Sequence, residues 1–404
     1  MDPREAAGPM DISELIDLQV ACLAGGFVIQ VDDARTVRQA QALGAVGALL
    51  LPNPSGDLRA TVRAIARVLT IHPVLSVGAG SAWESLCREE LGHTAPQAFL
   101  LGQPEAKRGR HYWPTLLSKA DLETVLTHET SLAVVDPALL PEVNRIRLDR
   151  HLTCLIFGLA SDIGQARRAV AASVDGLLLG FLPTSDQVET LARALLSGQP
   201  ALEKHLGRRL LGVLALQGDY HLQAEVLRRA LKQTAHPLAA QIEVGLVRSV
   251  ADAEACDALI MPGGWSNLQT HLLDLTGLAD HLVSRRRTGT PILAICAGMV
   301  LAASRPGQHC EDRRLLGLID LAVDNNQMSG LRRLQTGSGD TCELLFSNAP
   351  TARDLAVDVE VLGTSEGGEI VAARQDRVFV AAYHKGGDIH RRFIDHCLNY
   401  WGAF

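Results

Sequence analysis

The sequence predicts an α/β protein with two domains, and three observations lead to this prediction. The chain has 404 residues, which is longer than the usual size of one domain. Short apolar runs of strand length alternate with helical stretches along most of the chain, which is typical of parallel strands covered by helices. Hydrophobic residues make up 47% of the chain and aromatic residues only 4%, so the cores should consist of Leu, Val, Ile and Ala.

Composition and charge argue against several classes of protein. The net charge of −7 argues against a nucleic-acid partner. The eight cysteines form no CxxC motif, which predicts neither a disulfide framework nor a metal site and favours a reducing compartment. Residues 1–9 lack a signal-peptide pattern, and no apolar run approaches the roughly 20 residues that span a bilayer. We therefore expect a soluble, cytoplasmic protein with no membrane partner.

Residues 13–196 are predicted to form the first domain, after a disordered tail at residues 1–12. Asp32 or Asp33 is expected to cap its first helix. Roughly seven parallel strands over about 190 residues predict a (β/α) barrel-like domain that is shortened. The predicted strands are 26–31, 46–51, 73–77, 98–101, 132–135, 154–157 and 176–179, and the predicted helices are 33–43, 58–69, 83–91, 162–172 and 185–196.

Residues 197–209 are predicted to be a linker, and residues 210–404 a second α/β domain. A β-rich region is expected at 315–376, before a final apolar strand that ends at His384. The other predicted strands are 210–216, 244–247, 258–261 and 292–295, and the predicted helices are 221–232, 250–255, 268–286 and 390–400.

Cys296 lies where a short apolar run, Ile292 to Ile295, gives way to a helical pattern. A cysteine at such a strand-to-helix turn is held exposed, and the helix N-terminus favours its thiolate. Gly298 would let the helix pack close to the strand. This pattern predicts a nucleophile elbow with Cys in place of Ser. A buried cysteine that acts as a small hydrophobic residue explains the local pattern equally well.

Two further features could complete a site. Pro262-Gly263-Gly264 follows a strand and could offer backbone N–H groups to an oxyanion, although an ordinary turn is the commoner meaning of such a pattern. His384 ends a strand, where a base facing Cys296 could lie. Glycine turn, cysteine elbow and strand-terminal histidine, in this order, resemble the class I glutamine amidotransferases.

Longer stretches resemble the glutaminase subunit of deoxyxylulose-independent pyridoxal 5′-phosphate synthase. The resemblance implies a class I glutamine amidotransferase-like α/β/α fold, L-glutamine as substrate and pyridoxal phosphate synthase subunits as partners. The matching stretches are Gly212–Asp219, Ala258–Ser266, Cys296–Ala302, Leu316–Asp320 and Ile370–Gln375.

The same resemblance implies a role for each site residue. Cys296 would attack the amide carbon of glutamine, and His384 would be the base. The N–H groups of Gly264 and Ala297, beside Gly263, would form the oxyanion hole. The resemblance implies neither a cofactor nor a metal ion.

The first half resembles the synthase subunit of the same enzyme, which is a (β/α)8 barrel. That subunit joins a pentose phosphate, a triose phosphate and ammonia through lysine imines. The resemblance lies in Leu23–Val31 with its continuation to Val46, in Gly56–Ala60, and in Asp175–Gly180 with Arg193-Ala194.

The catalytic positions of the synthase subunit are not retained. The acidic residue of the first strand corresponds to Gln30, and the lysine of the third strand corresponds to Val77. No predicted strand of this half contains a lysine, so no imine can form there. Gly180-Phe181-Leu182-Pro183 replaces the glycine-rich phosphate loop. We therefore predict a fusion protein whose synthase-like half is degenerate.

The second half also departs from its family. The Pro-Glu pair that follows the histidine is replaced by Lys385 and Gly386, and Asp388 or Asp376 could supply the missing carboxylate. The Glu after the glycine turn is replaced by Trp265. The arginine-containing loop is replaced by residues 325–329, and a further arginine is replaced by Asn348.

Two hypotheses of different classes follow. The first is a glutaminase of vitamin B6 biosynthesis that retains its chemistry at Cys296 and His384. The second is a non-catalytic paralogue that scaffolds or regulates authentic synthase subunits. A third hypothesis is that Cys296 acts on another amide or on a thioester. The sequence leaves a homo-oligomer open.

Overall fold

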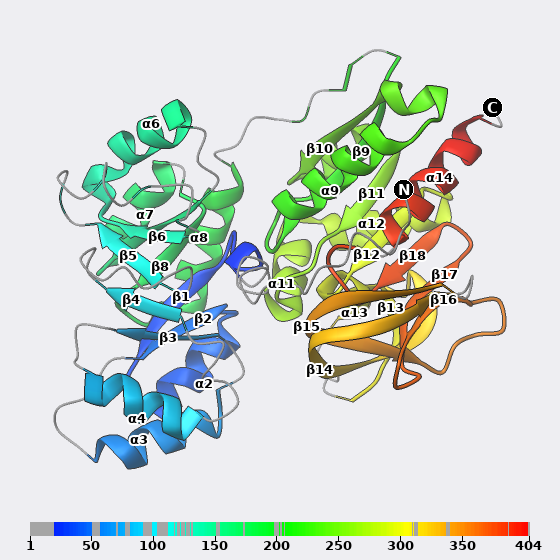
Figure 1. Cartoon of the computed structure of the whole chain (residues 1–404). Helices are drawn as coiled ribbons and strands as arrows, with labels where there is room; N and C mark the ends of the chain where they lie inside the picture. The colour runs from blue at the N-terminus through cyan, green and yellow to red at the C-terminus, as the bar shows by residue number, and fades with distance from the viewer. Residues whose placement is uncertain are drawn as a thin grey trace. The chain divides into compact units, whose positions relative to one another are not determined.

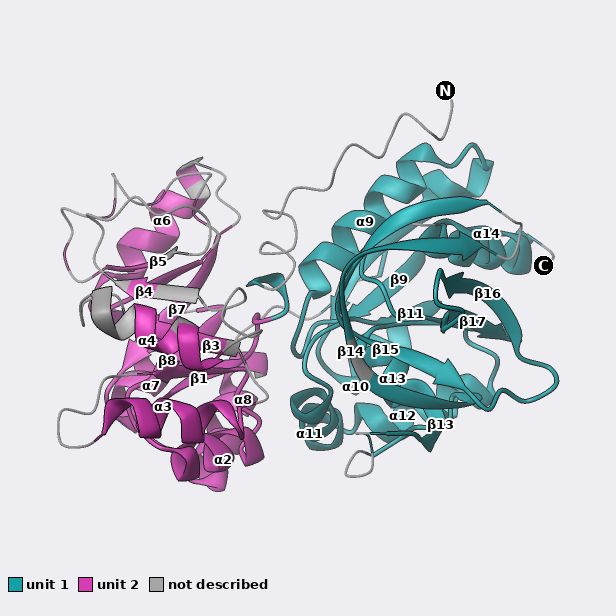
Figure 2. Ribbon diagram, turned by 60° about the horizontal axis from the view of Figure 1, so that its bottom comes forward, with its two compact units in different colours: residues 1–22, 200–404 teal, residues 23–199 magenta. Residues whose placement is uncertain are grey.

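A computed structural model of the chain forms two compact units (Figures 1 and 2). Unit 1 comprises residues 1–22 and 200–404, and unit 2 comprises residues 23–199. The predicted tail at residues 1–12 and the Val77 position lie outside the described residues. The structure describes residues 20–50, 57–69, 72–76, 81–91, 99–102, 112–116, 118, 122, 126, 130, 132–150, 154–172, 174–197, 202, 204–205, 207–308, 310, 314–336, 340–386 and 388–402.

In unit 2 the described strands are all parallel and pair in a closed ring, as in a barrel. The ring closes where β1 pairs with β8, at Phe27 and Leu177. The strands are β1 (Phe27–Val31), β2 (Gly47–Leu50), β3 (His72–Ser76), β4 (Phe99–Gly102), β5 (Tyr112–Leu116), β6 (Leu132–Val135), β7 (Leu155–Ala160) and β8 (Gly176–Leu179).

The sequence predicted about seven strands and a shortened barrel, whereas the described sheet has one strand more. The additional strand is β5, whose sequence YWPTL contains Pro114 and lacks the apolar run that marks the other strands. Apart from the number of strands, the sheet agrees with the parallel sheet that the apolar strands predict.

The helices of unit 2 are α2 (Ala34–Ala42), α3 (Leu58–Ala66), α4 (Ser81–Leu91), α6 (Leu140–Arg150), α7 (Ile163–Ala171) and α8 (Ser185–Ser197), with a short η4 (Pro137–Leu139) before α6.

Local sequence signals set the helix starts and the core of unit 2. Asp33 caps α2, because its side chain accepts a 2.7 Å hydrogen bond from the backbone N–H of Thr36. Every residue of β2, β6 and β8 is buried, as expected for strands with helices outside and side chains inside. The ring centroids of Trp113 and Phe157 lie 6.5 Å apart in the core. Gly176 lies against the Phe157 ring, where a larger side chain would not fit.

Unit 1 is built on one mixed sheet whose parallel part is β10 (Ile242–Val247), β9 (Arg209–Leu214), β11 (Ala258–Met261), β12 (Ile292–Ile295) and β18 (Val378–Ala381), in that spatial order. An antiparallel part continues from β18, which confirms the predicted β-rich region. Its strands are β17 (Ile370–Gln375), β15 (Thr341–Arg353), β14 (Ile319–Thr336) and β16 (Glu360–Ser365), and β13 (Ala303–Pro306) pairs parallel with β14.

The parallel order decides where the predicted site residues gather. The carboxyl ends of neighbouring parallel strands meet at one edge of a sheet, where ligands bind in open α/β sheets. In unit 1 the turns after β9, β11, β12 and β18 all lie on that edge. The helices around the sheet are α9 (Tyr220–Gln233), α10 (Val250–Ala255), α11 (Ser266–Thr276), α12 (Leu278–Arg287), α13 (Ala297–Ala302) and α14 (Ile389–Gly402), with a short η5 (Pro237–Gln241) before β10. None of the described helices combines the length and apolar character that crossing a membrane requires.

The packing at Gly176 gives a test of the core of unit 2. A methyl group on Gly176 would lie 2.4 Å from Cζ of Phe157 and 2.9 Å from the carbonyl oxygen of Gly26. We expect Gly176→Ala to lower the free energy of unfolding by about 1–3 kcal/mol, measured by urea denaturation.

Gly164→Ala is the matched control, because Gly164 lies in α7 and its methyl group would meet only side-chain ends, at 3.1 Å and 3.7 Å. Alanine favours a helix over glycine by up to about 1 kcal/mol, so this variant should be neutral or stabilised. Equal unfolding midpoints for the two variants would contradict the packing argument.

Candidate active site

Cys296 lies in the sharp turn between β12 and α13, as the elbow pattern predicts. Its φ is 47° and its ψ is −103°, a conformation that non-glycine residues rarely adopt. Two backbone hydrogen bonds hold it: its N–H donates to the carbonyl of Ala381 at 2.7 Å, and its carbonyl accepts from Val300 at 3.1 Å. Gly298 allows the close approach, since a Cβ there would lie 2.6 Å from the carbonyl oxygen of Met261. Backbone strain of this kind concentrates at functional sites.

His384 follows β18, which lies next to the cysteine strand, with Ile295 opposite Ala381. Its side chain is only 1% exposed, and Nδ1 lies 2.8 Å from Oδ2 of Asp219. Its Nε2 makes no hydrogen bond of standard geometry to any residue in the described ranges. Burial lowers the pKa of His384, but the charges and hydrogen bonds of Cys296 and Asp219 raise it to about 10. The structure therefore brings Cys296 and His384 together, with an acidic group on the far side of the imidazole.

The acidic group is not one of the two that the sequence suggested. The Asp388 side chain pairs with Arg392, and the Asp376 side chain pairs with Arg286. Asp219 pairs with the histidine instead, from the turn between β9 and α9. The sequence does not point to Asp219, because it lies 165 residues before His384. Its one signal is an aspartate that follows the apolar run of a parallel strand, and this signal does not identify His384 as the partner.

The glycine turn after β11 packs tightly against the histidine. A Cβ on Gly263 would lie 2.2 Å from Cε1 of His384, so no larger residue fits there. The carbonyl of Gly263 accepts hydrogen bonds from the Asp219 N–H at 3.0 Å and from Nε2 of Gln269 at 3.4 Å. These bonds fix the orientation of the peptide between Gly263 and Gly264. Gly264 has a φ of 152°, which favours glycine.

Gln217 is buried beside this turn. Its Oε1 accepts a 2.8 Å hydrogen bond from the N–H of Trp265, and its Nε2 donates to the carbonyl of Cys22 at 2.6 Å. Cys22 belongs to unit 1, and burial raises the pKa of its thiol well above the usual value, with the charges of Asp219 and Cys296 adding to the effect.

The positions that depart from the resembling family also lie close to the site. The carbonyl of Ser347 lies 4.0 Å from Sγ of Cys296, and Asn348 follows it with a φ of 48°. The N–H of Asn348 donates to Oγ of Ser329 at 2.9 Å. Trp265 is half-buried at the start of α11.

Across the described ranges, no group of three or more His, Cys, Asp or Glu side chains could hold a metal ion.

The second half of the chain is similar to known proteins. Residues 213–398 match the model of the SNO glutamine amidotransferase family. The pyridoxal 5'-phosphate synthase subunit PdxT of Nocardia farcinica (strain IFM 10152) is 34% identical over 205 residues, which cover 46% of this chain and 85% of that protein. The chain belongs to the SNO glutamine amidotransferase family.

Other relatives match a similar share of the chain. The subunit PdxT of Roseiflexus sp. (strain RS-1) is 34% identical over 180 residues, which cover 43% of this chain and 90% of that protein. A solved structure entitled "Crystal structure of glutamine amidotransferase" is 29% identical, with a TM-score of 0.40, and the match covers 46% of this chain and 98% of that one. The predicted class I glutamine amidotransferase-like fold of the C-terminal region is confirmed, and the family match does not extend to unit 2.

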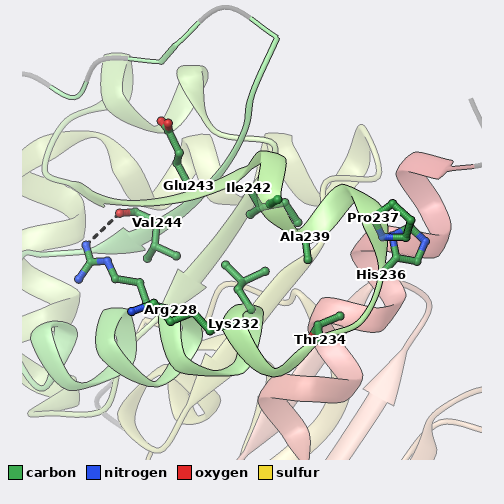
Figure 3. Close-up of a pocket in the computed structure, with 11 residues that line it drawn as sticks. Arg228, Lys232, Thr234, His236, Pro237, Ala239, Ile242, Glu243 and Val244 are labelled. Carbon is green, nitrogen blue, oxygen red and sulfur yellow. Dashed lines mark hydrogen bonds between the residues drawn. The ribbon is translucent and has the colours of Figure 1, made fainter.

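A surface hollow of about 770 Å³ lies elsewhere on unit 1, along α9, η5 and β10 (Figure 3). Arg228 borders it and donates a 3.0 Å hydrogen bond to the carbonyl of Val244. None of the predicted site residues lines this hollow. The candidate site is therefore defined by its side chains and turns and not by the size of a cavity.

The charge balance around His384 gives a test that needs no substrate. Because Cys296 is among the groups that raise the pKa of His384 to about 10, Cys296→Ala should lower that pKa. Proton–nitrogen NMR of the imidazole as a function of pH measures it, with the His384 signal assigned by its loss in His384→Gln.

Cys342→Ala, which removes a thiol on β15, serves as control and should leave the titration of His384 unchanged. An unchanged pKa in Cys296→Ala would show that the thiol does not interact with the imidazole.

Proposed function

We propose that this protein is a glutaminase of pyridoxal 5′-phosphate (vitamin B6) biosynthesis, which hydrolyses L-glutamine to glutamate and ammonia. The observation that carries the proposal is the strained Cys296 beside His384 in a chain of this family. The matched relatives are named as subunits of pyridoxal 5'-phosphate synthase. The ammonia would serve that synthesis.

The chemistry needs one nucleophile and one proton carrier. The Cys296 thiolate attacks the side-chain amide carbon of glutamine, and the imidazolium of His384 gives its proton to the departing nitrogen. The carbon–nitrogen bond breaks, ammonia leaves, and a thioester remains on Sγ. Water then attacks the thioester with His384 as base, which releases glutamate and restores the thiol.

The tetrahedral intermediates carry a negative oxygen that needs donors. We assign this role to the N–H groups of Gly264 and Ala297, with Gly263 forming the wall of the substrate site. The fixed carbonyl of Gly263 supports the assignment, since the following N–H of the same peptide must point to the opposite side. Ala297 begins α13, where the first N–H groups of a helix have no partner within the helix.

The barrel sheet of unit 2 supports a fusion with a synthase-like (β/α) barrel that has lost its own chemistry. None of the sequences of β1 to β8 contains a lysine. At the carboxyl ends of two of these strands, a Cβ on Gly180 would lie 3.6 Å from Oε1 of Gln30, so an amide lies where the resemblance predicts an acid. An authentic synthase subunit would then be the partner that consumes the ammonia.

The alternative function is a non-catalytic paralogue that scaffolds or regulates such subunits. One observation favours it: Cys296 is 6% exposed and His384 is 1% exposed, so the pair is closed to solvent in this conformation. Glutamine could reach Sγ only after the turns around the site move.

Glutamate release decides between the two functions. We expect the purified chain to release glutamate from L-glutamine, alone or with an added authentic synthase subunit, and Cys296→Ala to reduce the rate to background because the thioester cannot form. Cys342→Ala is the control and should retain the wild-type rate. Equal background release from wild type and Cys296→Ala in both conditions would contradict the glutaminase and favour the scaffold.

A further inference from the structure

The position two residues after the histidine of this site carries no carboxylate. The resembling family has a glutamate two residues after the histidine, where this chain has Gly386. Gly386 has a φ of +83°, and a Cβ on it would lie 2.6 Å from Cδ2 of Leu344. A side chain at this position would be strained, and the end of the Leu344 side chain would have to move. The loop after His384 therefore cannot take a glutamate without rearrangement.

Asp219 reaches the histidine from a distant part of the sequence. It occupies the N-cap position of α9, where an aspartate side chain usually accepts a hydrogen bond from the first turn. Here it makes no cap hydrogen bond, and its Oδ2 lies 2.8 Å from Nδ1 of His384. The carboxylate is thus used for the imidazole and not for its own helix.

Two further buried side chains fix the direction of every hydrogen bond. Gln223 donates through Nε2 to Oδ2 of Asp219 at 2.7 Å and to the carbonyl of His384 at 2.9 Å. Its Oε1 must therefore accept, and the partner at 2.8 Å is Nε2 of His390, which has to carry a proton. The same oxygen, Oδ2 of Asp219, faces both Gln223 and Nδ1 of His384. An ionised carboxylate can only accept, so Nδ1 of His384 then carries a proton as well. The remaining nitrogen, Nε2, is then free to exchange a proton with Cys296.

We propose that Asp219 is the positioning acid of the Cys296–His384 pair, supplied by the turn after β9 in place of the residue after the histidine, and that Gln223 and His390 hold it in place. The catalytic consequence rests on the proposed function, whereas the effect on the imidazole does not. Asp219 is a positioning residue, because it acts through the histidine and not on the substrate.

The electrostatic surroundings agree with this role. The titratable groups that act on His384 are Cys296 and Asp219, which both raise its pKa, and His390, with which it interacts across the network. The charges of Asp219 and Cys296 also act on Cys22 and raise the pKa of its thiol. Burial lowers the pKa of His390 to about 4, so that ring is neutral at physiological pH and acts as a donor to Gln223. Because His390 is neutral, it does not compete with His384 as a cationic partner of Asp219.

The rival carboxylates provide matched controls. The Asp376 side chain is 68% exposed and pairs with Arg286, and its φ of 52° suits asparagine as well as aspartate. Asp388 pairs with Arg392 at the start of α14. Both can be changed to asparagine, which keeps the shape of the side chain and removes its charge.

The first experiment measures turnover. Asp219→Asn should lower kcat for glutamate release on the order of 100-fold, with KM little changed, because the imidazole loses its orientation and its charge partner. Asp376→Asn and Asp388→Asn should stay within about two-fold of wild type. The upper limit of the pH–rate profile should move to lower pH in Asp219→Asn, since loss of the carboxylate lowers the pKa of His384.

The second experiment does not depend on activity. In the Cys296→Ala background, the two nitrogen chemical shifts of His384 report which nitrogen carries the proton when the ring is neutral. With Asp219 present we expect the proton on Nδ1. In Cys296→Ala/Asp219→Asn we expect a lower pKa and a proton that moves to Nε2, because the asparagine amide can donate to Nδ1. Gln223→Leu replaces Asp219→Asn if that variant does not fold. It removes the amide that holds Asp219 and keeps the carboxylate, so displacement of Asp219 should lower the pKa of His384 while the proton of the neutral ring stays on Nδ1.

The two readouts separate the two proposals. If no variant, wild type included, releases glutamate, the proposed glutaminase is wrong, and the NMR shifts still decide the role of Asp219. If Asp219→Asn keeps the wild-type kcat and the pKa and tautomer of His384 are unchanged, the positioning role is overturned. A loss of activity in Asp388→Asn or Asp376→Asn alone would overturn it in favour of that residue.

Discussion

The site depends on one buried contact, between the carboxylate of Asp219 and the imidazole of His384. A carboxylate without water is costly unless hydrogen bonds and opposite charge replace its solvent. Asp219 is 1% exposed as a residue and accepts from both His384 and Gln223. It also lies at the N-terminus of α9, whose dipole favours negative charge. These interactions offset part of the cost of burying the carboxylate, and the carboxylate in turn raises the pKa of His384.

This contact sets a steric condition on the sheet. Asp219 follows β9 and His384 follows β18, and the sheet places β11 and β12 between these two strands. The side chains must therefore meet above two intervening strand ends. At β11 the necessary space exists only because Gly263 has no side chain, since a Cβ would lie 2.2 Å from Cε1 of His384. Gly218 is needed for the same reason, because a Cβ at this position would lie 1.9 Å from the carbonyl oxygen of Gly263. The glycines are thus required for the acid–histidine contact as well as for an oxyanion site.

Features with local causes could be predicted from the sequence. The apolar strands, the elbow at Cys296 and the strand-terminal His384 each carry a signal within a few residues. β5 could not be predicted, because Tyr112-Trp113-Pro114 shows no strand pattern and becomes a strand only between its neighbours in the barrel. Asp219 could not be assigned either, since it lies 165 residues before His384 and only the sheet order brings the two together.

The conformation of Cys296 favours the nucleophile elbow over the buried small residue, the two interpretations that its local sequence left open. Packing of a small apolar residue gives no reason for a φ of 47°, a conformation whose cost is about 1–3 kcal/mol. Cys256 and Cys397 are also buried and free, and neither adopts a positive φ. Only the cysteine next to the histidine is held in this way, and the backbone bonds to Ala381 and Val300 maintain it.

The missing motif residue after His384 and the contact from Asp219 concern the same geometric requirement. An imidazole in this position needs a carboxylate at Nδ1, but its chemistry does not specify which loop supplies it. With Gly386 at a φ of +83°, an acidic side chain at this position of the loop after the histidine would be strained. The edge of a parallel sheet offers several other loops at the same distance, and the turn after β9 is one of them. A missing glutamate after the histidine is therefore weak evidence against catalysis, because the three-dimensional environment of Nδ1, and not the adjacent sequence, decides whether the base is oriented.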